Sequence, residues 1–149
     1  MFSINSFIKT AGGEFVQVEA CQTRPADPDY VEGAVEILAN GREIVGKREW
    51  DYVDQVWSYL ATMVKDLRSR ETVSVYYPDQ PIKIEFTRQA SRVVVASISG
   101  DMVRRASVDL LEFESVISAA GELFFGRMSE LLPERAESYK IARSELISG

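Results

Sequence analysis

The chain has 149 residues, of which 46% are hydrophobic and 27% charged, and these values are typical of one globular domain with its own core. Its 17 basic and 23 acidic residues give a net charge of -6, which disfavours binding to a nucleic-acid backbone. The chain has no histidine and one cysteine, which excludes histidine-based nucleophile pairs, histidine zinc ligands and intramolecular disulfides. We therefore expect a single domain over residues 1–149.

Targeting signals are not evident in the sequence. The first residues, Met1 to Asn5, lack the basic start and the long apolar stretch of a secretory signal. No apolar run reaches the roughly 18 residues that a membrane span requires. We expect a cytoplasmic protein without a membrane partner.

The first part of the chain has the alternating pattern of strands. Residues 2–8 predict a short strand, and residues 14–22 predict a half-buried one in which Val16, Val18 and Ala20 face opposite to Cys21. Two prolines and two aspartates between Thr23 and Asp29 predict a loop. The Asn40-Gly41 pair then predicts a tight hairpin turn between a strand over residues 31–38 and a returning strand over residues 43–45.

The middle of the chain changes to a helical period and back. Residues 49–70 predict an amphipathic helix with acidic residues at its start and basic residues at its end. Alternation then predicts strands over residues 72–77, 82–87, 92–99 and 102–108, separated by Pro-containing and Gly-containing turns.

Helices are predicted for the rest of the chain. Asp109 is expected to cap a helix over residues 110–132, and Pro133 suits the first turn of a last, shorter helix. The buried stripe of the longer helix is predicted to contain Phe113, Val116, Ile117, Ala120, Leu123, Phe124, Met128 and Leu131. Tyr139, Ile141 and Leu146 are the apolar contacts expected from the last helix.

The order of these elements predicts an α+β fold with about eight antiparallel strands, two long helices and a short C-terminal helix. Strands and helices occur in separate runs, whereas a parallel sheet needs them to alternate.

No catalytic, cofactor or metal motif is recognisable in the sequence. Asp27 and Asp29 resemble the opening of a calcium loop, but Glu32 occupies its glycine position and Leu38 its bidentate acid position. No glycine-rich loop has the spacing that phosphate binding requires. We expect no catalytic residue, metal or cofactor, and the sequence favours a binding domain over an enzyme.

Two acidic segments are the candidate surface for a protein partner. They are the loop with Asp27, Asp29 and Glu32, and the start of the first helix with Trp50, Asp51 and Asp54. Aromatic side chains can supply binding hot spots and carboxylates can match a basic partner. The alternative interpretation is that the aromatic residues Trp50, Tyr52 and Trp57 belong to the core and the acids only solubilise the surface.

In size, acidity and element order the chain resembles the small immunity proteins that bacteria make against their own polymorphic toxins. The residues that carry the resemblance are the helix from Trp50 to Leu67, the segment Val73-Ser74-Val75-Tyr76-Tyr77 and the segment from Pro81 to Phe86. The resemblance implies a non-catalytic inhibitor whose acidic patch binds a basic toxin, and it transfers no site residue.

Two other functions remain open from the sequence. One is a small-ligand or enzymatic domain with a pocket between sheet and helices, in which Tyr76, Tyr77 or arginines replace histidine. The other is a structural homo-oligomer that pairs through an uncovered sheet edge or an apolar helix face.

Overall fold

The computed structural model describes residues 1–147, and Ser148 and Gly149 of the predicted domain lie outside this part. Residues 1–147 contain nine strands and three α-helices, which confirms the α+β class. The strands are β1 (Phe2–Lys9), β2 (Phe15–Gln17), β3 (Glu32–Ala39), β4 (Arg42–Val45), β5 (Asp51–Tyr52), β6 (Thr72–Tyr76), β7 (Lys83–Gln89), β8 (Arg92–Ser99) and β9 (Met102–Asp109). The helices are α1 (Val53–Leu67), α2 (Leu110–Leu131) and α3 (Ala136–Ile147).

The strands form two antiparallel sheets. The first has the order β2-β1-β3-β4, with the short strand β5 also paired to β3, and the second is the meander β6-β7-β8-β9. The predicted hairpin between β3 and β4 is confirmed, because Asn40 and Gly41 both have the positive φ values of such a turn, 53° and 81°. Side chains link the sheets where β4 meets β8, since the Ser97 hydroxyl donates to the Ile44 carbonyl at 2.6 Å.

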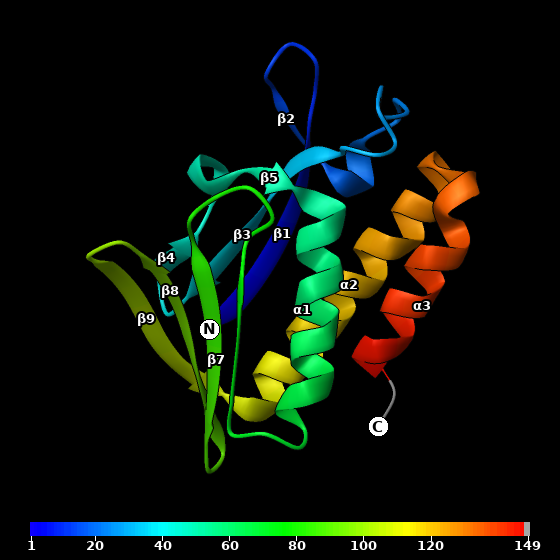
Figure 1. Cartoon of the computed structure of the whole chain (residues 1–149). Coiled ribbons are helices and arrows are strands. Elements are labelled where there is room, and N and C mark those ends of the chain that lie inside the picture. The colour runs from blue at the N-terminus through cyan, green and yellow to red at the C-terminus, as the bar shows by residue number, and fades with distance from the viewer. Residues whose placement is uncertain (148–149) are drawn as a thin grey trace.

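The three helices lie together on one side of the sheets (Figure 1). Helix α1 packs on β6, β7 and β3, helix α2 packs on β1, and α3 covers α1 and α2 from outside. Asp109 caps α2 as predicted, because its carboxylate accepts the Glu112 N–H at 3.1 Å. None of the helices in residues 1–147 has the length and apolar character needed to cross a membrane.

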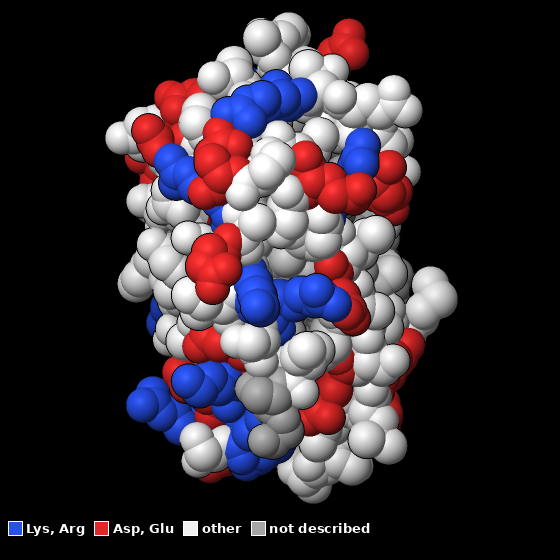
Figure 2. Space-filling view, turned by 90° about the vertical axis from the view of Figure 1, so that its right-hand side faces the viewer, with Lys and Arg blue, Asp and Glu red and all other residues white. Residues whose placement is uncertain are grey.

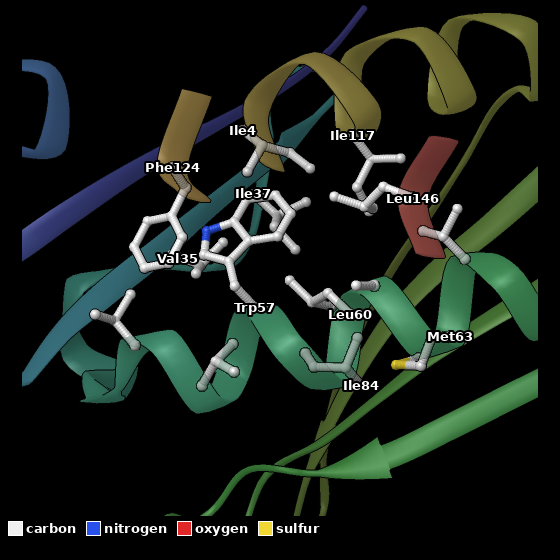
Figure 3. Packing of buried hydrophobic residues seen from close by; sticks show 14 of the residues in the cluster. Ile4, Val35, Ile37, Trp57, Leu60, Met63, Ile84, Ile117, Phe124 and Leu146 are labelled. Carbon is white, nitrogen blue, oxygen red and sulfur yellow. The ribbon is translucent and has the colours of Figure 1, made fainter. Parts of the chain in front are cut away.

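Trp57 lies at the centre of the core between α1, β1 and α2. Its ring is fully buried and stacks on Phe124 at a centroid distance of 5.8 Å, and Figure 3 shows Ile4, Val35 and Ile37 around it. The indole N–H would be costly to bury without a partner, and the Ser6 hydroxyl accepts it at 2.8 Å. Trp57 therefore joins three elements through packing and one hydrogen bond.

Phe113 of α2 connects the core to both sheets. Its ring contacts Phe2 of β1 at a centroid distance of 5.4 Å and Phe86 of β7 at 5.0 Å. Because aromatic pairs at this separation stabilise packing beyond their buried area, Phe113 holds the sheets against one helix.

One predicted strand ends earlier than expected, and one predicted helix begins later. The strand predicted for residues 14–22 stops at Gln17, and a 3-10 helix over Val18–Ala20 follows, which buries Cys21 and exposes Ala20. The helix predicted from residue 49 begins only at Val53, because Asp51 and Tyr52 extend along β3 as β5. Pairing with a neighbouring strand has overridden the helical pattern there.

The predicted buried stripes of α2 and α3 are wrong at two positions. Leu123 and Ile141 are exposed, whereas Phe125 and Ala142 are buried in their place. Because α3 packs along α2, the buried face of α2 is wider than one stripe and includes the residue next to Phe124. The periodicity of one helix could not indicate where a second helix would cover it.

Gly121 and Gly126 of α2 offer a matched test of this packing. A Cβ on Gly121 would lie 2.3 Å from the Leu146 Cδ1 and 2.9 Å from the Trp57 ring, whereas a Cβ on Gly126 would meet no atom within 4 Å. Both substitutions to alanine improve helix propensity equally, so their difference isolates the packing cost. We expect Gly121→Ala to be less stable than Gly126→Ala by about 1 to 3 kcal/mol in urea unfolding. Equal stabilities would contradict the close approach of α2 to Trp57.

Candidate functional site

A hollow lies where the end of β1 meets the long loop before β3, and we call it the loop pocket. Its volume is about 420 Å³. The floor is apolar and formed by Ile8, Cys21 and Val31, all of which are buried. The wall and rim are Lys9, Thr10, Ala11, Thr23, Arg24, Pro25, Ala26, Asp27, Tyr30 and Glu32.

The loop that forms the pocket is held by contacts at both ends. At its start, the guanidinium of Arg127 in α2 donates to the Cys21 carbonyl, with its Nε at 3.1 Å. In its middle, the Asp27 carboxylate accepts the Asp29 N–H at 3.0 Å, which is the local bond that favours aspartate in turns. Ion pairs then connect Arg24 to Glu134 and Asp29 to Arg135. The pocket therefore belongs to an ordered surface loop, where the prolines prevent strand pairing.

An aromatic and cationic layer lines one side of the loop pocket. Tyr30 is 56% exposed and its ring contacts Tyr52 at a centroid distance of 5.3 Å. The Lys9 ammonium lies 4.5 Å above the Trp50 ring and 3.6 Å from the Glu32 carboxylate. Trp50 thus reaches the pocket through Lys9 and is only partly exposed.

The basic groups around the loop pocket already have acidic partners within the chain. Lys9 pairs with Glu32 and Arg24 with Glu134, and the bond from Arg24 lowers the pKa of Glu134 to about 2. In residues 1–147, Asp27 and Glu14 have no ion-pair partner, and both are exposed. The charge left for an outside partner at this end is therefore negative.

This negative charge is local and does not extend over the neighbouring face. Figure 2 views the side of the molecule that α3 forms, and acidic and basic side chains are interleaved across it. Two arginines of the second sheet have partners within the chain. Arg104 lies 3.9 Å from Glu43 and 3.8 Å from Glu49, and Arg92 donates to the Ser107 hydroxyl.

The structure separates the six residues proposed from the sequence as a partner surface. Asp27 and Glu32 line the loop pocket, and Trp50 adjoins it through Lys9. Asp29 lies between the lining residues Asp27 and Tyr30, and its carboxylate pairs with Arg135, which lines a separate hollow. Asp51 and Asp54 are not among the residues that line the pocket.

Asp51 is buried and acts within the fold. It is only 3% exposed, and its carboxylate accepts the N–H groups of Tyr52, Asp79 and Gln80 at 2.7, 3.0 and 2.9 Å. These bonds hold the turn between β6 and β7 against the start of α1. A partner cannot reach Asp51. The sequence could not indicate this, because two of its three hydrogen-bond partners, Asp79 and Gln80, lie almost thirty residues further along the chain.

Asp54 lies on α1 beside α3, in a separate hollow of about 200 Å³. Its carboxylate accepts the Tyr139 hydroxyl at 2.9 Å. Burial raises the pKa of the Asp54 carboxyl above its ordinary value, although the bond from Tyr139 favours the charged form. Asp54 therefore serves the contact between α1 and α3 and does not line the loop pocket.

Tyr30 and the apolar floor of the pocket were not singled out in the sequence. An aromatic residue directly after Pro28-Asp29 was an available signal, because large exposed aromatics in polar loops mark binding sites. Ile8, Cys21 and Val31 gave no such signal, because each reads as a core residue of its own segment. Among residues 1–147, no three carboxylate or thiol groups lie close enough together to hold a metal ion.

Comparisons of the chain with protein-family models, with curated proteins and with solved structures found no match.

Removing the Asp51 carboxylate tests its role within the fold. Asp51→Ala leaves three backbone N–H groups without an acceptor, so we expect a loss of about 2 to 4 kcal/mol in urea unfolding. Asp27→Ala, on the exposed loop, is the control and should change stability by less than about 1 kcal/mol. Equal effects of the two substitutions would contradict a structural role for Asp51.

The raised pKa of Asp54 predicts a pH-dependent effect of Asp54→Asn. A carboxyl with a raised folded pKa adds stability that is fully present below its unfolded pKa of about 4 and is lost as pH rises through the folded value. Asparagine can still accept from Tyr139 but carries no charge. We measure the melting temperature of the variant minus that of the natural protein by thermal unfolding. This difference should be more positive at pH 7 than at pH 3.5. Asp101→Asn, on an exposed turn, is the matched control.

Proposed function

We propose that the chain is a non-catalytic protein-binding domain and that the loop pocket is its docking site. The observation that carries this proposal is an ordered hollow with an apolar floor, a half-exposed tyrosine and unpaired acidic charge at its rim. Binding energy in protein interfaces is concentrated at such places, where an anchor side chain enters a pocket and a polar rim excludes water.

The chemistry of the pocket specifies the kind of partner. Ile8 and Val31 favour an apolar or aromatic side chain of the partner, and Tyr30 can stack beside it. Asp27 favours a lysine or arginine next to that anchor, because the nearby cations Lys9 and Arg24 are already paired. The partner segment is therefore an apolar anchor flanked by basic residues.

A basic toxin is the partner class that fits this description and the resemblance to immunity proteins. The net charge of -6 on the chain would accelerate association with a basic protein, and the local carboxylates would select its orientation. In this proposal the chain neutralises the toxin by covering its surface, which requires no chemistry.

A small apolar ligand is the second candidate, because about 420 Å³ is within the range of small-molecule sites. The space between sheets and helices is less suited to a ligand. Aromatic side chains fill it around Trp57, and the hollow between β1 and α2 measures only about 30 Å³. The loop pocket is therefore the place where either candidate must be tested.

Binding to a captured partner tests the proposal. The immobilised chain should retain a basic protein from the native lysate, and that protein, once purified, should bind with one-to-one stoichiometry. Tyr30→Ala removes a predicted hot spot, so we expect the dissociation constant to rise about 30-fold or more in calorimetry. Asp27→Lys should slow association and reduce its dependence on salt.

The control is Tyr76→Ala, which removes a tyrosine of similar exposure, 63%, from the second sheet and should leave binding unchanged. A captured protein that is toxic when expressed alone and harmless with the chain would support the immunity function. Equal binding by the Tyr30 and Tyr76 variants would contradict docking at the loop pocket. Saturable binding of an apolar dye, lost in Tyr30→Ala, with no protein partner would favour the ligand alternative.

A further inference from the structure

Strand β6 forms an edge of the second sheet, and its outer backbone groups are open. Backbone bonds from Tyr77 to Ile82 and from Arg88 to Glu71 mark the hydrogen-bonded pairs at the two ends of the β6-β7 ladder. In an antiparallel pair these alternate with non-bonded pairs, so Val73 and Val75 also bond to β7. The N–H and C=O groups of Thr72, Ser74 and Tyr76 therefore point away from the sheet. Within residues 1–147, no backbone bond outside the ladder uses them.

Strand β9, at the opposite edge, is covered by the chain itself. The bond from the Leu110 N–H to Ser91 sets the same alternation there, so the carbonyls of Arg105 and Ser107 point outward. The Asn40 amide donates to the Ser107 carbonyl at 2.8 Å, and the Arg42 guanidinium donates to the Arg105 carbonyl at 3.2 Å. The fold thus blocks one sheet edge with side chains, as natural proteins do to prevent pairing.

The open edge of β6 is also uncharged and has space beside it. Its sequence, Thr-Val-Ser-Val-Tyr, contains no charge or proline, which are the residues that usually protect an edge strand. A groove of about 330 Å³ follows the strand. The other wall of this groove is formed by Tyr59, Thr62, Met63 and Asp66 of α1 and by Arg70, which follows the helix. An added strand would have both hydrogen-bonding groups and a flanking helix.

We propose that a second copy of this chain occupies the groove, and that the two β6 strands pair antiparallel about a two-fold axis at Ser74. This register makes Ser74 face Ser74 of the second copy and Thr72 face Tyr76 of the second copy. All the outward backbone groups of both strands are then satisfied. The two meanders join into one continuous eight-stranded sheet, an isologous contact of the kind that closed dimers use.

Strand β6 has the residue pattern that its own groove requires. A strand added beside β6 must place small apolar side chains next to Val73 and Val75 on the helix side and polar ones on the other side. The alternation of β6 meets this requirement, because its valines face the helices while Thr72 and Ser74 face solvent. Self-pairing therefore needs no further partner sequence.

The same two-fold axis brings the α1 walls of the two copies together, and their side chains match. Helix α1 runs opposite to β6, so Tyr59 lies near one end of the groove and Arg70 near the other. The two-fold axis brings Arg70 to Tyr59 of the second copy, where a cation can lie over an aromatic ring. Neither Arg70 nor Asp66 has an ion-pair partner among residues 1–147. The loop pocket shares no residue with this groove, so the dimer is independent of the proposed function.

Molar mass in solution tests the dimer directly. Light scattering coupled to gel filtration should give twice the chain mass of 16.7 kDa, and dilution should return the monomer. Ser74→Pro removes an outward N–H from each copy without touching the β7 ladder, so the dimer dissociation constant should rise about 30-fold. Val103→Pro makes the same change on the outward side of β9 and should leave the dimer intact. A monomer at all concentrations, or a dimer unaffected by Ser74→Pro, overturns the proposal.

A cysteine at the axis gives a second measurement that does not depend on the proline variants folding. In the proposed register the two Cα atoms of residue 74 are about 5.5 Å apart, which is within disulfide range. Ser74→Cys should therefore form a covalent dimer rapidly on mild oxidation, and the natural Cys21 is buried and should not. Val103→Cys, on the other edge, is the control. Equal cross-linking by both variants, or none by Ser74→Cys, would show that β6 does not pair with itself.

Discussion

The buried indole of Trp57 is the contact on which the arrangement of the helices depends. Its N–H must reach the Ser6 hydroxyl on β1, which places α1 at one distance from the first sheet. Its ring must also stack on Phe124, which brings α2 so close that only glycine fits at position 121. Leu146 of α3 closes over that same glycine. One side chain therefore sets the positions of β1, α1, α2 and α3, and the loop pocket and the β6 groove lie at the margins of this assembly.

The position of α1 also determines which backbone groups remain open. Asp51, just before α1, accepts the N–H groups of Asp79 and Gln80 and so fixes the turn that ends β6. That turn holds β6 alongside α1 with its outer edge free. At the other edge, Asn40 and Arg42 occupy the carbonyls of β9. The outward carbonyls of β9 therefore have hydrogen-bond partners, whereas the outward backbone groups of β6 have none in the part of the chain that the structure describes.

Much of the fold could be predicted from the sequence, but the candidate site could not. Alternation and helical period indicate nearly every strand and helix, and Asp109 and Asn40-Gly41 mark their ends correctly. The errors arise where contacts with a distant element override the local pattern. Pairing with β3 makes Asp51 and Tyr52 a strand, and packing against Tyr139 of α3 buries Phe125, whereas Leu123 is exposed. The loop pocket combines Ile8 and Val31, which are more than twenty residues apart, and local patterns contain no information about such pairs.

The placement of the acidic groups supports the proposed protein-binding function. Asp51 points at backbone N–H groups, and Asp54 bonds to a tyrosine that packs α3 onto α1. Glu32 and Glu134 neutralise Lys9 and Arg24. Asp27 faces solvent without an ion-pair partner in the described residues 1–147, on the rim of an apolar hollow, where its electric field can select the charge of an approaching protein. Asp51 and Asp54 therefore stabilise the fold, and Asp27 remains accessible to a partner.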